Sequence, residues 1–388
     1  MASSSSAATT SDGNQGLKAR DVCIVGVART PIGALLGSLS SLPATKLGSI
    51  AIQGTYPPRH SLASNGALKR AKVDPALVQE VFMGNVLSAN LGQAPARQAA
   101  LGAGLPYSVP CTTVNKVCSS GMKALQCESL ILERYHQLVA AVMFAAQSIQ
   151  LGINDVVVAG GMESMSNAPK YVAEARRGSR FGHDVLVDGM LKDGLWDVYN
   201  DFPMGMCAEL CSDQHSISRE EQVEIPSGRG KPPVVVDKDE SLAKFDPVKL
   251  KKLGPTFKTN GSVTAGNSSS ISDGAAAIVL VSGEKAKKLG LQVIARIRGY
   301  ADAAQAPELF TTAPALAIPK AISNAALQNS QIDYYEINEA FSGKLNLSGG
   351  AVSLGHPIGC SGARIIVTLL GATFFAYSFI IVKLVQAN

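Results

Sequence analysis

The sequence predicts an α/β fold, because short apolar runs typical of buried strands alternate with helical patterns along the chain. The predicted strands are 22–27, 81–86 and 156–159, and the predicted helices between them include 94–101 and 143–151. Apolar strand patterns return at 275–281 and 293–297, so a second half of the core is expected to start near Asp273. This alternation predicts mainly parallel strand pairing.

Composition excludes several classes of protein. Hydrophobic residues make up 46% of the 388 residues, which is ample for a buried core and too much for a disordered chain. The net charge of +5 is small and scattered, so no nucleic-acid partner is expected. The 37 glycines against one tryptophan indicate tight turns and close backbone approaches, as in α/β enzymes with small-molecule sites.

The seven cysteines indicate a reducing compartment. Their odd number and irregular spacing argue against a disulfide framework. Cys207 and Cys211 are four residues apart, but no CxxC or HxxxH pattern lies nearby, so no metal site is expected. Any catalytic histidine must come from only five in the chain.

The two ends of the chain carry unusual compositions. The start is rich in Ser, Ala and Thr and lacks the apolar core of a signal peptide, so residues 1–20 are expected to be a disordered tail. Near the other end, residues 365–382 are uncharged and apolar. This pattern fits either a short membrane span or a buried helix running into a buried strand, and we regard membrane association as the less favoured alternative.

A looped subdomain is expected over about 164–263, where Pro, Gly and charged residues become frequent. Stretches such as GRGKPPVVVDKDE and KKLGPTFKTNG show this change of composition. Such a segment is typical of loops that lie over a core and carry binding residues.

Cys118 is a candidate nucleophile. The stretch VNKVCSSGMK at 114–123 predicts a turn that opens a helix, and a helix N-terminus would lower the pKa of the thiol. Gly121 leaves room for a substrate carbonyl beside backbone N–H donors. A buried structural cysteine in a tight strand-to-helix turn explains this motif alone equally well.

His356 and Asn338 complete a possible reactive set. His356 lies among five glycines in GGAVSLGHPIGCSGAR, where Pro357 stiffens the loop that presents the ring, so the histidine is a candidate base. Asn338, in YEINEAF, could hold a water or an oxyanion, or it could form an Asx turn. Nucleophile, base and amide together indicate acyl transfer through a covalent thioester.

The stretches VNKVCSSGMKA, INEAF and GGAVSLGHPIGCSGAR resemble the signatures of the thiolase family. From Val22 to about Gly371 the chain is similar to plant members of this family. The resemblance implies two similar βαβαβαββ halves in a five-layered sandwich with a loop subdomain. It places the first half at 21–283, including the loop subdomain at about 164–263, and an incomplete second half at 284–388.

The resemblance also implies roles for individual residues. Cys118 matches the nucleophile that takes the acetyl group, and His356 matches the base that activates it. Asn338 matches the residue that holds a water, which forms an oxyanion hole together with His356. Four further residues match positions that touch the pantetheine or acyl end of coenzyme A: Met204, Ala265, Ser269 and Phe341.

The implied activity is the reversible condensation of two acetyl-CoA molecules to acetoacetyl-CoA and CoA. Acyl-CoA molecules are then the partners, coenzyme A is a substrate, and no further cofactor is expected. The resemblance implies a homodimer or homotetramer in the cytoplasm, with peroxisome and mitochondrion as alternatives. Such a reaction serves isoprenoid precursor synthesis or, in reverse, fatty acid β-oxidation.

The chain also departs from the family pattern. The family has a second catalytic cysteine in a C-terminal CxGGG-type motif, whereas no cysteine follows Cys360 here, and Cys360 itself is a separate residue beside the His356 loop. Segments 54–66 and 126–142 are additional, and 221–227 and 342–348 are shortened. These departures leave open an impaired relative that binds acyl-CoA or only self-acetylates, and they leave open whether Asn338 and His356 meet.

Overall fold

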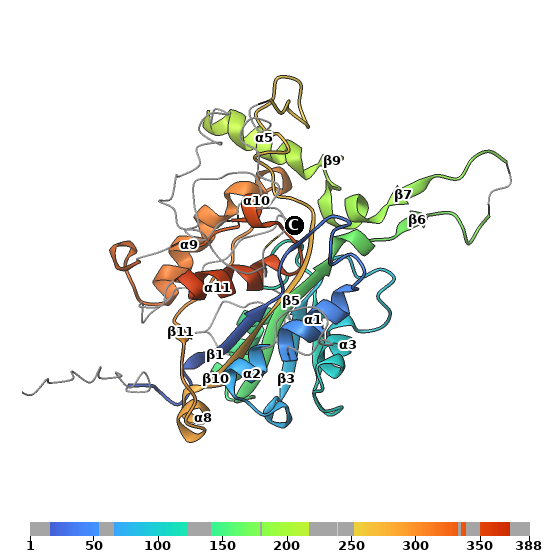
Figure 1. Cartoon of the computed structure of the whole chain (residues 1–388). Coiled ribbons are helices and arrows are strands. Elements are labelled where there is room, and N and C mark those ends of the chain that lie inside the picture. Colours follow the sequence, from blue (N-terminus) through green and yellow to red (C-terminus); the bar gives the residue numbers. More distant parts are fainter. Residues whose placement is uncertain are drawn as a thin grey trace, which may run out of the picture.

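A seven-stranded sheet forms the centre of the computed structural model, which describes residues 16–53, 66–122, 141–178, 181–216, 239, 252–332, 335–338 and 350–372 (Figure 1). The strand order is β11-β1-β10-β5-β3-β4, and β2 pairs with β10. The strands are β1 (Val22–Arg29), β2 (Gly33–Ala34), β3 (Glu80–Gly84), β4 (Cys111–Val114), β5 (Val156–Ser164), β10 (Ser272–Ser282) and β11 (Ala295–Ile297).

The sheet is mixed, so the prediction of mainly parallel pairing is wrong. β3 runs parallel to β4 and β5, but β10 runs antiparallel to β1, β2 and β5, and β11 runs antiparallel to β1. The chain leaves the sheet after Ser164 and re-enters it at Ser272, and the next residue, Asp273, pairs with Ser164. Because the chain returns at the end of the sheet where β5 finishes, β10 must run back antiparallel along β5.

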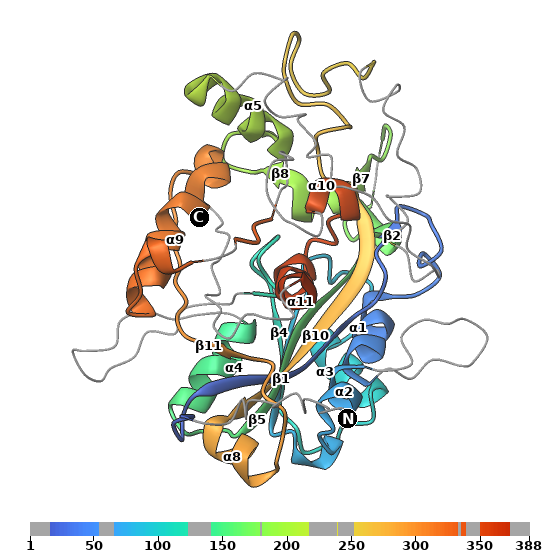
Figure 2. The same cartoon turned by 60° about the vertical axis from the view of Figure 1, so that its left-hand side comes forward.

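Helices cover both faces of the sheet (Figure 2). On one face lie α1 (Ala44–Gln53), α2 (Ala67–Ala71) and α3 (Pro95–Gly102), and on the other α4 (Ala141–Gln150) and α11 (Ser361–Ala372). Successive residues of β10 point to opposite faces of the sheet. Val279 therefore packs in the hydrophobic cluster beneath α1, α2 and α3, and Leu280 packs in the cluster beneath α4 and α11. The described core therefore has three layers, helix on sheet on helix.

The predicted α/β class is confirmed, and the predicted strands and the two predicted helices are present. Ile365 and Ile366, from the apolar C-terminal stretch, are buried in α11 against the sheet. Within the described ranges, no helix is long and apolar enough to cross a membrane. Residues 373–382 of that stretch, the additional and shortened segments apart from their outermost residues, and the first fifteen residues of the predicted tail lie outside the described residues.

The predicted loop subdomain contains short elements around one longer helix. β6 (Lys170–Val172) and β7 (Leu186–Asp188) form a hairpin that projects from the body in Figure 1. β8 (Trp196–Asp197) pairs with β9 (Phe202–Pro203), and α5 (Met204–His215) follows directly. This helix is tied to the returning chain because Glu209 accepts hydrogen bonds from the backbone of Ser262 and Val263 (both 2.8 Å).

The expected second half contributes mainly helices to the described structure. They are α8 (Gly283–Lys288), α9 (Ala313–Asn324), α10 (Ala351–Leu354) and α11. Its one strand within the described ranges, β11, extends the first-half sheet by pairing with β1. The described residues also contain short helical turns: Pro75–Leu77, Met165–Asn167, Leu191–Leu195, Pro307–Thr312 and Asn329–Gln331.

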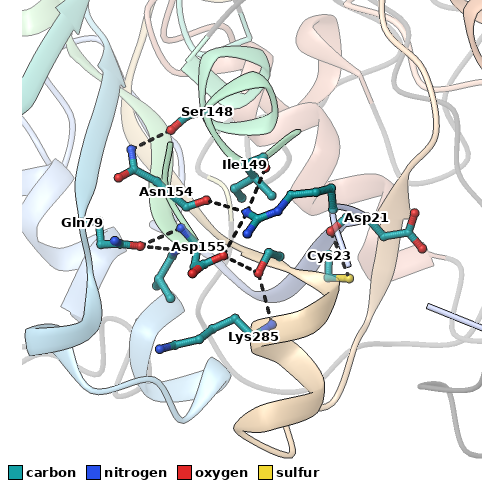
Figure 3. A network of polar contacts seen from close by, with 11 residues as sticks. Asp21, Cys23, Gln79, Ser148, Ile149, Asn154, Asp155 and Lys285 are labelled. Atoms are coloured by element: carbon teal, nitrogen blue, oxygen red, sulfur yellow. Dashed lines mark hydrogen bonds and ion pairs between the residues drawn. The ribbon is translucent and has the colours of Figure 1, made fainter. Parts of the chain in front are cut away.

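A polar network fastens the end of the sheet at which β1 and β5 begin (Figure 3). Asp155 Oδ1 accepts hydrogen bonds from Arg20 (3.0 Å) and from the Ser282 hydroxyl (2.8 Å). Gln79 Oε1 accepts from the backbone N–H of Asp155 (2.6 Å), which joins the start of β5 to the segment before β3. Arg20, from the expected tail, is therefore anchored to the body of the protein.

We expect Leu280→Ala to destabilise the protein by about 2–5 kcal/mol, because truncating a buried leucine leaves a cavity in a packed core. Leu280 is fully buried near the C-terminal end of β10. Leu316→Ala on α9, where the side chain is 45% exposed, is the matched control and should change stability by less than about 0.5 kcal/mol. Urea unfolding measures both variants, and equal losses would contradict the assignment of Leu280 to the core.

Candidate active site

Cys118 lies in a tight turn directly after β4. Asn115 Oδ1 accepts a hydrogen bond from Val117 N–H (3.1 Å), and Ser120 Oγ accepts one from Lys116 N–H (2.7 Å). Val117 has a φ of 45°, in the left-handed region that β-branched residues rarely adopt. Strained backbone held by local hydrogen bonds is typical of residues presented for chemistry.

Cys118 is half-buried as a residue and packs against an apolar cluster formed by Val86, Leu87, Met165 and Ile358. Burial raises the pKa of Cys118 to about 12, and the nearby Glu163 carboxylate acts in the same direction. The prediction of a lowered thiol pKa is therefore wrong, because burial outweighs the backbone hydrogen bond that favours the thiolate. The helix expected after this turn lies in 123–140, outside the described residues.

His356 is buried in the loop between α10 and α11. Its backbone N–H donates to Ser270 O (3.0 Å), and its ring Nδ1 lies 2.7 Å from Ser361 Oγ. Because the Ser361 hydroxyl donates to Pro357 O (3.2 Å), we infer that Nδ1–H donates to Ser361 Oγ and that Nε2 is an acceptor. Burial, with a smaller effect of the Arg364 charge, lowers the pKa of His356 to about 3, so the ring is neutral near pH 7.

Asn338 lies beside His356, so the structure brings these two predicted residues together despite the shortened link between them. Asn338 Nδ2 is 3.5 Å from His356 Nε2. The segment is anchored two residues earlier, where Glu336 Oε1 lies 3.5 Å from Arg364 Nη1 in a buried ion pair. Asn338 Oδ1 has no hydrogen-bond partner among the described residues, so this oxygen can still accept a hydrogen bond. Its role in holding a water stays a prediction.

Glycines allow the Cys118 turn, β5 and the His356 loop to meet backbone to backbone. A Cβ on Gly161 of β5 would lie 2.2 Å from Gly359 O and 3.0 Å from Gly121 Cα. A Cβ on Gly121 would lie 3.1 Å from the same Gly359 oxygen. Any side chain at these positions would push the loops apart, so the glycines fix how closely the predicted nucleophile and base approach.

A single buried carboxylate joins the same segments. Glu163, near the end of β5, is fully buried, and its Oε1 accepts hydrogen bonds from Asn85 Nδ2 (2.9 Å) and Leu87 N–H (3.2 Å). Its Oε2 accepts from Val86 N–H (3.0 Å) and Gly359 N–H (2.9 Å). Burial raises the pKa of Glu163 to about 7, although the backbone donors partly offset this shift.

The structure describes three of the four residues that are predicted to contact coenzyme A, and their role stays a prediction. Met204 begins α5, which packs on the segment that carries Ala265 and Ser269, because Gly205 lies against the Phe257 ring. Ser269 precedes Ser270, whose carbonyl holds the His356 backbone. No hydrogen bond or apolar cluster in the described part of the chain joins the side chains of Met204, Ala265 and Ser269 to one another. Phe341 lies outside the described residues.

The other cysteines occupy different surroundings. Cys207 is buried and Cys211 half-buried on α5, and the described ranges contain no group of three His, Cys, Asp or Glu residues that could hold a metal. Cys360 is fully buried against the sheet, and burial raises the pKa of its thiol to about 12. It packs in the α11 layer, apart from the Cys118 cluster, as the sequence predicts.

Three structural features of the site were not predicted from the sequence. Glu163 is the only charged residue in the apolar stretch VVVAGGMESM, and that isolation was a usable signal. Ser361, which orients the His356 ring, follows it by five residues within the same motif. The Glu336–Arg364 ion pair could not be predicted from the sequence, because the two residues are far apart along the chain.

The thiolase N-terminal domain matches residues 22–131, 138–226 and 223–284, and the thiolase C-terminal domain matches residues 291–373. The chain is 64% identical to Acetyl-CoA acetyltransferase 1 of Arabidopsis thaliana, over 92% of this chain and 88% of that protein. The chain belongs to the thiolase family. A Schizosaccharomyces pombe acetyl-CoA acetyltransferase is 48% identical, over 90% of this chain and 91% of that one.

Solved thiolase structures confirm the predicted thiolase fold. An acetyl-CoA acetyltransferase from Syntrophomonas wolfei superposes with a TM-score of 0.77 at 32% identity, covering 92% of this chain and 93% of that chain. The Acat5 thiolase from Ascaris suum, solved in complex with coenzyme A, gives a TM-score of 0.76 at 38% identity, covering 91% and 93%. The overall arrangement is therefore that of a thiolase.

We expect the buried His356 of this thiolase to make its stability fall with acidification. The folded state holds a neutral ring with a pKa of about 3, whereas the unfolded chain takes up a proton below about pH 6.5. Between pH 6 and 4, the free energy of unfolding of the wild type should fall by roughly 1 kcal/mol per pH unit more than that of His356→Asn. The raised pKa of Glu163 acts in the opposite sense but is common to both proteins. Urea unfolding at several pH values measures this difference, and parallel profiles would contradict it.

Proposed function

We propose that this chain is an acetyl-CoA C-acetyltransferase, which condenses two acetyl-CoA molecules to acetoacetyl-CoA and CoA through an acetyl-Cys118 intermediate. The observation that carries the proposal is the meeting of the Cys118 turn with the His356 loop at Gly161, with Asn338 beside the ring. The names of relatives up to 64% identical support the same activity.

The first half of the reaction moves the acetyl group to Cys118. The sulfur attacks the thioester carbonyl as the thiol proton passes to His356 Nε2. The bond from the carbonyl carbon to the CoA sulfur then breaks, and CoA leaves as its thiol by taking that proton from Nε2. The raised pKa of the Cys118 thiol and the lowered pKa of His356 keep both groups neutral at rest. The proton therefore moves during the attack rather than before it, and the new Nε2–H can then donate to the developing oxyanion.

The second half forms the carbon–carbon bond. A base removes a proton from the methyl group of a second acetyl-CoA, and the resulting carbanion attacks the acetyl-Cys118 carbonyl. Acetoacetyl-CoA forms as the bond to the Cys118 sulfur breaks, and the sulfur takes up the proton from the base to restore the thiol. In the reverse direction, Cys118 attacks acetoacetyl-CoA, and free CoA then removes the acetyl group. No cofactor besides these CoA compounds takes part in the proposed reaction.

The assay is thiolysis of acetoacetyl-CoA by CoA with purified protein in the presence of EDTA. Wild type should produce acetyl-CoA, and Cys118→Ala should lower kcat by at least about 10³-fold, since no other group supplies the nucleophile. Cys111→Ser is the matched control, because this free, half-buried thiol lies on β4 before the reactive turn, and it should stay within about threefold of wild type.

Mass spectrometry after incubation with acetyl-CoA separates the two functional hypotheses. Turnover together with an acetylated Cys118 supports the complete reaction. An acetylated Cys118 without thiolysis in folded protein would instead establish the impaired relative that only self-acetylates. Folded wild type with neither activity would overturn the proposal.

We infer that the protein assembles into homo-oligomers. Apolar side chains are exposed along the projecting β6–β7 hairpin, where Phe181 is fully exposed and Leu186 is 67% exposed. An apolar projection of this kind is typical of an interface between subunits. Light scattering after size exclusion measures the mass in solution, and a monomer at micromolar concentration would contradict the inference.

We infer a cytoplasmic location, with peroxisome and mitochondrion as the alternatives. The cysteines in the described part of the chain are all free, which fits a reducing compartment. One relative, from Gibberella zeae, is named a cytosolic acetyl-CoA acetyltransferase. Cell fractionation with organelle markers tests the location, and enrichment with an organelle would contradict it.

A further inference from the structure

The reactive loops of this thiolase are connected through one carboxylate, which among the described residues forms no hydrogen bond with either reactive side chain. Glu163 accepts hydrogen bonds from three donors in 85–87 and from Gly359 N–H. A fully buried carboxylate with four donors has its two oxygens occupied, so its position is fixed by two loops that are far apart in the sequence.

One side of this connection leads to Cys118. Asn115 Nδ2 donates to Val86 O (3.4 Å), and Asn115 Oδ1 accepts from Val117 N–H, directly before the nucleophile. Val86 also belongs to the apolar cluster in which the thiol packs. The backbone of 85–87 therefore sets the position of the Cys118 turn.

The other side leads to His356. Gly359 follows the histidine by three residues, and Ile358 contributes to the same apolar cluster as Cys118. The Gly359 oxygen lies against Gly161, and the Gly359 N–H points to Glu163. The His356 loop is thus positioned through the backbone of Gly359, whose N–H donates to Glu163 and whose oxygen packs against Gly161.

We propose that Glu163 is a positioning residue for acetyl transfer, which sets the separation between the Cys118 turn and the His356 loop by holding 85–87 and Gly359 together. The proposal rests on the proposed function, because the separation matters only if the thiol and the imidazole share a proton. An error of about 1 Å in such a pair is enough to cost about 100-fold in rate.

The donors around Glu163 define which substitution is informative. All four groups that face it are N–H donors, so Glu163→Gln places an amide –NH₂ against at least one N–H and breaks part of the connection while keeping the size. Glu163→Asp keeps the charge on a shorter side chain. The titratable groups whose charges interact with Glu163 are Asp273 on β10 and the thiols of Cys118 and Cys360.

The experiment measures kcat and KM for thiolysis together with the rate of Cys118 acetylation by acetyl-CoA. We expect Glu163→Gln to lower kcat and the acetylation rate about 100-fold while KM changes less than about threefold. Glu163→Asp should recover at least tenfold over the Gln variant. Leu280→Ala is the control for general destabilisation, because Leu280 lies on β10 six residues beyond Gly274, which pairs with Glu163 in the sheet. This variant should keep kcat within twofold of wild type.

A Glu163→Gln protein that folds and keeps kcat within threefold of wild type would overturn the proposal. So would an equal loss of kcat in Leu280→Ala. If Glu163→Gln fails to fold, Asn85→Ala removes one donor and leaves the carboxylate, and it should lower kcat five- to tenfold; an unchanged kcat would count against the proposal. If wild type shows no thiolysis, the proposed function fails. The role of Glu163 can then still be tested by the rate at which Cys118 is acetylated, or alkylated by iodoacetamide. Equal rates in wild type and Glu163→Gln would exclude a positioning role for Glu163.

Discussion

Direct backbone contact between three chain segments is the constraint on which the site depends. The Cys118 turn, β5 and the His356 loop meet at Gly121, Gly161 and Gly359, where a Cβ on Gly161 would lie 2.2 Å from the Gly359 oxygen. Contact this close removes side chains from the interface, so no rotamer can adjust the distance between the loops. The geometry is therefore set by backbone packing and by the hydrogen bonds that flank it, with the central sheet as a rigid base.

Burial gives the site its electrostatic character. Taking the Cys118 thiol out of water raises its pKa to about 12, and taking the His356 ring out of water lowers its pKa to about 3. Both shifts disfavour charge, so the resting pair is a thiol and a neutral imidazole rather than an ion pair. Ser361 at Nδ1 leaves Nε2 to receive a proton. Charge then develops only when a substrate carbonyl is present to stabilise it, which protects the thiol from reaction with other electrophiles.

Sequence reasoning predicted the local elements and the reactive residues but not the links between them. Continuous apolar runs identified β5 and β10, because these strands are buried on both faces. The direction of β10 could not be predicted, since it depends on where the chain re-enters the sheet after about a hundred residues. The shift in the Cys118 pKa was also not predictable, because it depends on burial by Val86 and Ile358, which are distant in sequence.

The two half-reactions depend on different parts of the chain. Acetyl transfer needs the nucleophile, the base and the contacts that space them, and these are assembled from β5, 85–87, the Cys118 turn and the His356 loop, all within the described residues. Condensation additionally needs a base for the methyl proton, which the family takes from a C-terminal cysteine that this sequence lacks after Cys360. Because the first set is held together by contacts within the described residues, Cys118 acetylation does not depend on a C-terminal cysteine, whereas thiolysis requires another group of this chain to serve as that base. Acetylation and thiolysis are therefore separable properties of this chain.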